Sequence, residues 1–419
     1  MRRGYKWMLL ALLGGAYFFH QADRALFGLM TIPIRSDLGL SDVQIGWINT
    51  ALSWTIAVMT TVAGFLGDRF SRKWLITGSL LFWSLATLCM GFVGEWHVCG
   101  ITLSAFAVVM FFRSIATGGG ESFYGPSAMS LLASYHRETR SVAFSVHQAT
   151  LYIGLMTSGV LAAWALGLLG SWRRVFMAFG GAGLLLGLVF IFALREAPDR
   201  AAADRGGRPS LGESVAAYFG NPSALLATSG FVAIVFANNA YLFWAPTFMA
   251  EKFGIDVGKA GGDTMLYHHL FAFAAILLGG WITDRFVGRM PRFRLGFQVV
   301  ALLCGAPALY FVGKCGSASA MVAMTAAYGV FRGFFEVNTH ASVFDVVPAR
   351  FRASAVGFML LIAFFVGGLS GVMMGSLSHG MGVRGFEIGF ALMAAAYVLA
   401  AVLMSVSFFF TFRRDRIRE

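Results

Sequence analysis

The chain has 419 residues, of which 58% are hydrophobic and only 12% are charged. A soluble domain carries about 25% charged residues, and an apolar run of about 18 residues is long enough to cross a bilayer, so this composition excludes an ordinary soluble protein. The apolar runs lack the alternating pattern of barrel strands, and we therefore predict an all-α integral membrane protein.

Twelve apolar stretches follow one another along the chain, and each predicts a transmembrane helix. They cover residues 7–34, 46–66, 74–94, 101–134, 142–169, 173–194, 223–250, 262–283, 294–313, 318–346, 353–379 and 384–412. The one long polar interval separates six spans from six. We expect an N-terminal six-helix bundle over 1–194, a cytoplasmic linker over 195–222 and a C-terminal six-helix bundle over 223–419. Within the linker, Ser210 and Glu213 fit a capping box that opens a short amphipathic helix over 211–219, although a plain solvated linker fits the same residues.

The net charge of +12 follows the predicted topology. When residues at the ends of spans are counted with the adjoining loops, 22 of the 32 Lys and Arg residues lie in the termini and the even-to-odd loops, seven in the other loops and three inside spans. Positive residues favour the cytoplasmic side, so we expect both termini in the cytoplasm and the protein in the cell (inner) membrane. The basic balance then reflects topology and does not predict nucleic-acid binding.

The first span contains His20, Asp23 and Arg24. Charged residues within spans are costly and are functional hypotheses by default. His20 precedes Asp23 by three residues and Arg24 by four, so the three side chains can share one polar stripe. We predict that Arg24 binds an anionic group while Asp23 orients it or titrates. A structural ion pair with another helix is the alternative.

The fourth span places Arg113 and Glu121 on either side of three glycines, with Tyr124 one turn further. An interval of eight residues turns the two charged side chains about 80° apart, unless the glycine run holds a bulge. Competition between burial and a nearby guanidinium would let Glu121 bind a proton in one state and release it in another. A purely structural Arg–Glu contact is the alternative.

The tenth span holds Arg332, Glu336 and His340 at successive i, i+4 positions, with Asn338 nearby. This spacing predicts one face of one helix, and we expect it to line a substrate path. His268 and His269 are expected closer to the outer mouth, where ordinary solvated histidines fit the sequence equally well.

Two loop sequences repeat between the halves: GFLGDRFSRK at 64–73 and GWITDRFVGR at 280–289. The chain resembles the major facilitator superfamily over its whole length, although Ser71 replaces the second glycine of that loop signature. The resemblance implies two pseudo-symmetric six-helix bundles, with a substrate site at their interface. It also implies a conformational latch on the cytoplasmic side, formed by Asp68, Arg69, Asp284 and Arg285.

The stretch from Arg113 through GGGESFYGPSAMSLLASY, together with NPSALLATSGF at 221–231, is most similar to the spinster-type branch. The anion:cation symporter branch is the close runner-up. The resemblance implies alternating access driven by an ion gradient. We predict that the gradient is one of protons, with no cofactor, no metal and no catalytic residue. We expect a monomer that transports an organic anion or a lysolipid-like anionic amphiphile, with no nucleic-acid partner. The alternatives are a symporter for sugar acids or small carboxylates, and a non-transporting sensor.

The candidate site residues fall into two groups. The substrate-binding candidates are Arg24, Arg113, Arg332, Tyr124 and Asn338. The proton-coupling candidates are Glu121, Asp23, Glu336, His20 and His340.

Overall fold

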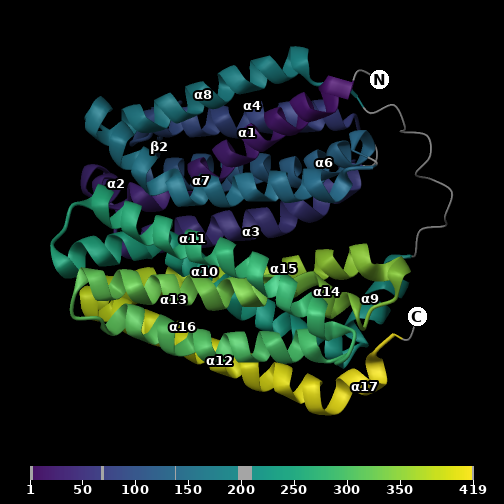
Figure 1. The fold of residues 1–419 in the computed structure, drawn as a ribbon. Coiled ribbons are helices and arrows are strands. Elements are labelled where there is room, and N and C mark those ends of the chain that lie inside the picture. Colours follow the sequence, from purple (N-terminus) through teal and green to yellow (C-terminus); the bar gives the residue numbers. More distant parts are fainter. Residues whose placement is uncertain (1–2, 68–69, 137, 197–209, 418–419) are drawn as a thin grey trace. The chain divides into compact units, whose positions relative to one another are not determined.

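The computed structural model describes residues 3–67, 70–136, 138–196 and 210–417, and helices contain most of them (Figure 1). In the first half of the sequence they are α1 (Arg3–Leu29), α2 (Thr31–Leu38), α3 (Asp42–Gly67), α4 (Arg72–Cys89), the 3₁₀-helix η1 (Met90–Phe92), α5 (Ala105–Val109), the π-helix η2 (Met110–Ala116), α6 (Thr117–Tyr135), α7 (Arg140–Leu169) and α8 (Trp172–Ala193). In the second half they are α9 (Leu211–Phe219), α10 (Pro222–Phe253), α11 (Val257–Val287), α12 (Phe293–Lys314), α13 (Ala318–Glu336), α14 (Thr339–Phe344), the 3₁₀-helix η4 (Ala349–Phe351), α15 (Arg352–Met381), α16 (Val383–Val406), the π-helix η5 (Ser407–Thr411) and α17 (Phe412–Asp415).

Nine helical segments in the described part of the chain are long and apolar enough to cross a membrane. The all-α membrane class predicted from composition is therefore confirmed. Three predicted spans, over 7–34, 101–134 and 318–346, are not among these nine. These are the spans that carry the charged side chains, and each is irregular: the first is divided into α1 and α2, the second contains η2, and the third is divided into α13 and α14.

Two compact units divide the chain. Unit 1 comprises Met1–Arg205, Leu242–Ala250 and Ile255–Met265, and unit 2 comprises Gly206–Tyr241, Glu251–Gly254 and Leu266–Glu419. In unit 1, α1 packs along α7, and α4 packs along α6 and α8. The buried core between these helices includes Leu13, Trp83, Tyr124, Leu131 and Phe190. In unit 2, α12 packs along α13 and α16, and α15 packs along α16.

Glycines let α8 approach α4 in unit 1. A Cβ atom on Gly180 would lie 2.3 Å from the backbone nitrogen of Leu88, and one on Gly183 would lie 2.2 Å from the Ser84 hydroxyl. Gly187 meets Leu81 in the same way. Spacings of three and four residues put these glycines on one helix face, the pattern by which small residues allow close packing in membranes.

We predict that Gly180→Ala destabilises unit 1, because the added methyl group meets backbone that has no room to move. Overpacking of this kind costs about 1–3 kcal/mol of unfolding free energy. The control is Gly181→Ala on the next residue, where nothing lies within 4 Å of the added Cβ atom. Thermal unfolding in detergent, followed by tryptophan fluorescence, should give a lower Tm for the first variant only. Equal Tm values for both variants would contradict the packing described.

The predicted capping box at the end of the linker is confirmed. The Ser210 hydroxyl accepts a hydrogen bond from the Glu213 amide, and the Glu213 carboxylate accepts one from the Ser210 amide, at the start of α9. Helix α9 contacts the rest of unit 2 through two aromatic residues. The Tyr218 hydroxyl lies 2.5 Å from that of Thr228 in α10. The rings of Tyr218 and Phe219 both contact Phe358 of α15.

A short antiparallel hairpin precedes α5. Strands β1 (Trp96–Val98) and β2 (Ile101–Leu103) pair with Trp96 opposite Leu103. Cys99 and Gly100 between them both have positive φ, as in a type I′ turn. These are the sole strands in the part of the chain that the structure describes, and their length is far too short for a barrel.

Candidate functional site

Asp23 of α1 is buried in unit 1, with 1% of its surface exposed. The Thr87 hydroxyl of α4 donates a hydrogen bond of 2.8 Å to its Oδ2 atom. The other carboxyl oxygen, Oδ1, has no hydrogen-bond partner among the described residues. A buried carboxyl normally fills its acceptor sites, so an open one marks a position for a proton, water or a ligand.

The π-helix η2 carries Arg113. The π-helical geometry is seen at the end of η2, where the Thr117 amide donates a hydrogen bond to the Phe112 carbonyl five residues back. A π-turn absorbs one extra residue, which offsets the eight-residue interval between Arg113 and Glu121. The irregularity that the sequence suggested is therefore present, but it precedes the glycine run, which lies within the regular helix α6.

The glycines before Glu121 allow neighbouring helices to come close. A Cβ on Gly118 would lie 2.9 Å from the side chain of Leu52 in α3, and one on Gly120 would lie 3.0 Å from that of Trp83 in α4. Gly119 between them has open space. Two of the three glycines thus set the distance of α6 from α3 and α4, and so fix where Glu121 lies.

The Arg113 guanidinium is directed toward α1. Its Nη2 atom donates a hydrogen bond of 2.7 Å to the Arg24 carbonyl, and the group lies 5.5 Å from the centre of the Phe27 ring. No ion pair joins Arg113 and Glu121, although both residues are described. The Nε atom of Arg113 has no hydrogen-bond partner within the described ranges.

Glu121 is buried and has His20 as its nearest charged or titratable contact given by the structure. The Oε2 atom lies 3.7 Å from His20 Nε2, which is too long for a hydrogen bond. Gln21 donates to His20 Nδ1 at 2.9 Å, so a neutral His20 carries its proton on Nε2, on the side of the carboxyl. Neither oxygen of Glu121 has a hydrogen-bond partner in the described chain, while the charges of Arg24 and Arg113 both act on it.

Aromatic rings continue this cluster through unit 1. His20 meets the edge of Trp83 at 5.2 Å, and His147 stacks on Tyr17 at 4.5 Å. The Tyr124 hydroxyl donates to the Leu13 carbonyl and lies 3.4 Å from His147 Nε2. Tyr124, a predicted substrate contact, is thus fully buried in the core with its hydroxyl engaged.

Sequence reasoning missed three members of this cluster: Tyr17, Trp83 and Thr87. Tyr17 lies three residues before His20, and that helical spacing could have placed it on the same stripe. Thr87 and Trp83 belong to an ordinary apolar span in which no local pattern marks them.

In unit 2, Arg332 of α13 is the centre of a second cluster. Its guanidinium pairs with Glu336 at 3.1 Å and donates to His268 Nε2 of α11 at 3.2 Å. His268 Nδ1 in turn donates to the Thr325 carbonyl at 3.3 Å. Because a carbonyl only accepts and a guanidinium only donates, this arrangement holds His268 as a neutral imidazole protonated at Nδ1.

His268 and His269 are both fully buried, so the alternative of ordinary solvated histidines is wrong. Close helix packing explains their burial: a Cβ on Gly329 of α13 would lie 2.2 Å from the His268 carbonyl. Tyrosine rings surround His268, with Tyr241 at 4.5 Å and Tyr328 at 4.7 Å. The Tyr397 hydroxyl donates to that of Tyr328 at 3.4 Å and extends this aromatic shell.

The expected single helix through Arg332, Glu336 and His340 is interrupted. Helix α13 ends at Glu336 and α14 begins at Thr339, so the prediction of one continuous face is wrong. Asn338 lies at the break and donates a side-chain hydrogen bond of 3.0 Å to Thr283 of α11. His340 follows the break and is exposed, and the charge of Glu336 still acts on it.

The latch residues are described only in part. Asp284 and Arg285 are exposed at the end of α11, where the Arg285 guanidinium lies 5.8 Å from the Trp281 ring centre. Asp68 and Arg69 lie outside the described residues. Next to them, Ser71 caps the N-terminus of α4 and also donates to the Glu196 carboxylate, which gives a local reason for serine at a position where the signature has glycine.

We predict that Thr87→Val destabilises unit 1, because it removes the hydrogen bond to the buried Asp23 carboxyl. Leaving a buried polar group without its partner costs about 1–3 kcal/mol. The control is Thr77→Val on the same helix, since the buried Thr77 hydroxyl has no partner among the described residues. Detergent unfolding curves should show a lower Tm for Thr87→Val alone, and an unchanged Tm would remove this contact from the site.

Comparisons with known proteins agree with this architecture. The family model described as Major Facilitator Superfamily matches residues 13–372. The chain is 24% identical over 390 residues to Protein spinster homolog 1 of Rattus norvegicus, covering 88% of this chain and 72% of that protein. It is 25% identical over 300 residues to the probable galactarate/D-glucarate transporter GudP of Bacillus subtilis (strain 168), covering 67% of this chain and 65% of that protein.

Among solved structures, the fold is similar to that of a bacterial homolog to the human lysosomal transporter Spinster in an inward-facing and unoccupied conformation. The TM-score is 0.85 with 20% sequence identity, over 100% of both chains. The D-xylose-proton symporter has a similar fold, with a TM-score of 0.78 and 14% identity over 99% of each chain.

Proposed function

The chain belongs to the Major Facilitator Superfamily and is a spinster-type membrane transporter rather than an enzyme, and from this premise we propose that it is a proton-coupled carrier of an organic anion or anionic amphiphile. The observation that supports the coupling is the Glu121 carboxyl, which is buried among charged groups with both oxygens unbonded in the described structure. The carrier works by alternating access and needs a proton gradient but no cofactor.

Proton and substrate binding are linked through the positive charges near Glu121. The charges of Arg24 and Arg113 act on the carboxyl and favour its ionised form, whereas burial favours the neutral form. An anion bound to either guanidinium would cancel part of that positive field. Glu121 then takes up a proton together with the substrate, and Asp23, with its open Oδ1 atom, is the second carboxyl available for this exchange.

Unit 2 supplies a different kind of contact. Arg332 is fixed by Glu336 and the neutral His268, and tyrosine rings surround the imidazole. A guanidinium beside aromatic rings suits an anionic head with an apolar body, which favours a lysolipid-like substrate. The similarity to a probable galactarate/D-glucarate transporter favours the second candidate, a symporter for sugar acids or small carboxylates.

The excess of Lys and Arg in the termini and even-to-odd loops supports an inner-membrane protein with both termini in the cytoplasm. The proposed carrier acts as a monomer, and Asp284 and Arg285 take part in its cytoplasmic latch.

We predict that Glu121→Gln abolishes uptake driven by a pH gradient in proteoliposomes, with at least a tenfold loss. Exchange of labelled against unlabelled substrate should persist, because it needs no net proton movement. The control is Glu138→Gln, a charge change at an exposed position of the loop before α7. Undiminished pH-driven uptake in Glu121→Gln would remove this residue from the coupling site.

We predict that Arg24→Ala abolishes stabilisation by the substrate. The wild-type protein is screened by thermal unfolding against lysophosphatidylglycerol, glucarate and small carboxylates, and the ligand that raises Tm identifies the substrate class. The same ligand should leave the Tm of Arg24→Ala unchanged, since a guanidinium is the main attraction for an anion. An unaltered Tm shift in this variant would exclude Arg24 from the anion site.

A further inference from the structure

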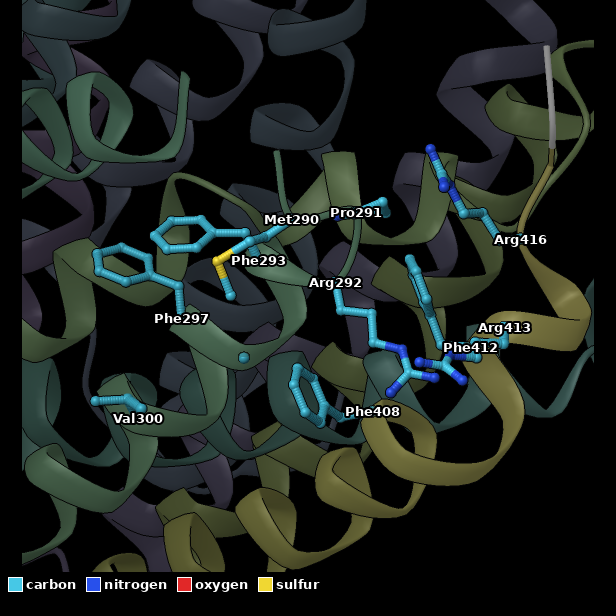
Figure 2. Close-up of a pocket in the computed structure, with 11 residues that line it drawn as sticks. Met290, Pro291, Arg292, Phe293, Phe297, Val300, Phe408, Phe412, Arg413 and Arg416 are labelled. Carbon is cyan, nitrogen blue, oxygen red and sulfur yellow. The ribbon is translucent and has the colours of Figure 1, made fainter. Parts of the chain in front are cut away.

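A pocket of about 730 Å³ lies in unit 2, between the start of α12 and the segment formed by η5 and α17. Three arginines line it: Arg292 before α12, and Arg413 and Arg416 at the end of the chain (Figure 2). Apolar residues form the rest of its wall, among them the aromatic side chains of Phe297 and Phe408. None of these residues belongs to the charged clusters described above.

The arginines of this pocket keep donors available for a ligand. At this end of unit 2 the acidic groups are bound elsewhere, Asp345 by Arg294 at 2.7 Å and Asp415 by Arg414 at 2.8 Å. Among the described residues, none of the three lining arginines forms an ion pair, although the charge of Arg416 acts on Asp345. The Arg292 guanidinium lies 5.5 Å from the centre of the Phe408 ring. Three cations gathered around one cavity repel each other and attract an anion.

The edge of the pocket is apolar and exposed. Met290 and Val300 line it and are 55% and 57% exposed, and Phe409 and Phe410, next to Phe408, are 63% and 77% exposed. In a membrane protein such surfaces contact acyl chains. Guanidinium groups beside an apolar helix surface are the combination that recognises an anionic lipid, with phosphate bound by arginine and the chains along the helix.

We propose that this pocket binds the headgroup of an anionic phospholipid from the surrounding bilayer. The phosphate interacts with Arg292, Arg413 and Arg416, and the acyl chains lie along the exposed side chains of α12 and η5. The site is separate from that of the transported substrate, and it would attach the C-terminal segment to the bilayer at the start of α12.

The test compares two triple variants of the full chain. Arg292→Gln, Arg413→Gln and Arg416→Gln remove the charges of the pocket. Arg140→Gln, Arg289→Gln and Arg350→Gln remove three exposed charges outside it and lower the net charge equally. Binding to the delipidated protein is measured by native mass spectrometry with phosphatidylglycerol and with phosphatidylcholine of the same acyl chains.

Wild type and the control variant should bind one phosphatidylglycerol more tightly than phosphatidylcholine. The pocket variant should bind it at least tenfold more weakly, because each arginine near an anionic lipid contributes about a fivefold factor. The single variant Arg413→Gln should bind phosphatidylglycerol about fivefold more weakly than wild type. Because Arg413 is exposed, this variant should fold and can be tested even if the triple variant does not fold.

Two results would overturn the proposal. An equal loss in both triple variants would mean a general attraction of the basic surface rather than a site. Displacement of phosphatidylglycerol by millimolar inorganic phosphate would mean a pocket for small soluble anions.

Discussion

The hydrogen bond from the Arg113 guanidinium to the Arg24 carbonyl links the π-helix η2 to α1, and the charges of Asp23 and Glu121 act on the same guanidinium. A buried guanidinium must be satisfied within the protein, because lipid offers no partner. Arg113 donates to a backbone carbonyl, which is a neutral acceptor. It therefore forms no ion pair with the carboxyl of Asp23 or of Glu121. In the proposed carrier, Asp23 and Glu121 therefore stay available for exchange of protons.

The two units solve the problem of a buried arginine differently. In unit 2, Arg332 pairs with Glu336 on its own helix and with His268 of α11, so its charge is compensated by side chains. In unit 1, Arg113 has a backbone acceptor and no ion pair with Glu121. This difference leaves a carboxyl without a hydrogen-bond partner among the described residues in unit 1 and an ion-paired cation near tyrosine rings in unit 2. In the proposed carrier, coupling and binding are accordingly divided between the halves of the sequence.

Helix irregularity and buried charge coincide in this protein. Each of the three spans that carry the charged candidate residues is interrupted or contains a π-helix, as at 110–116 and at the break after Glu336. A regular helix satisfies all of its backbone groups, whereas an interrupted one frees some of them and changes the direction of side chains. The close approach permitted by glycines at Gly120 and Gly329 then brings neighbouring helices against these points.

The sequence by itself determined the membrane class, the order of the spans, the capped helix α9 and the identity of most charged candidates. These properties depend on composition and on spacing along one helix, which are local. The partners of the charged groups were decided only by the tertiary structure. Thr87 at Asp23 and His268 at Arg332 come from other helices, where no pattern in their own segment marks them. The side chains at the π-helix and at the helix break likewise have their partners on other helices, since Arg113 bonds α1 and Asn338 bonds α11.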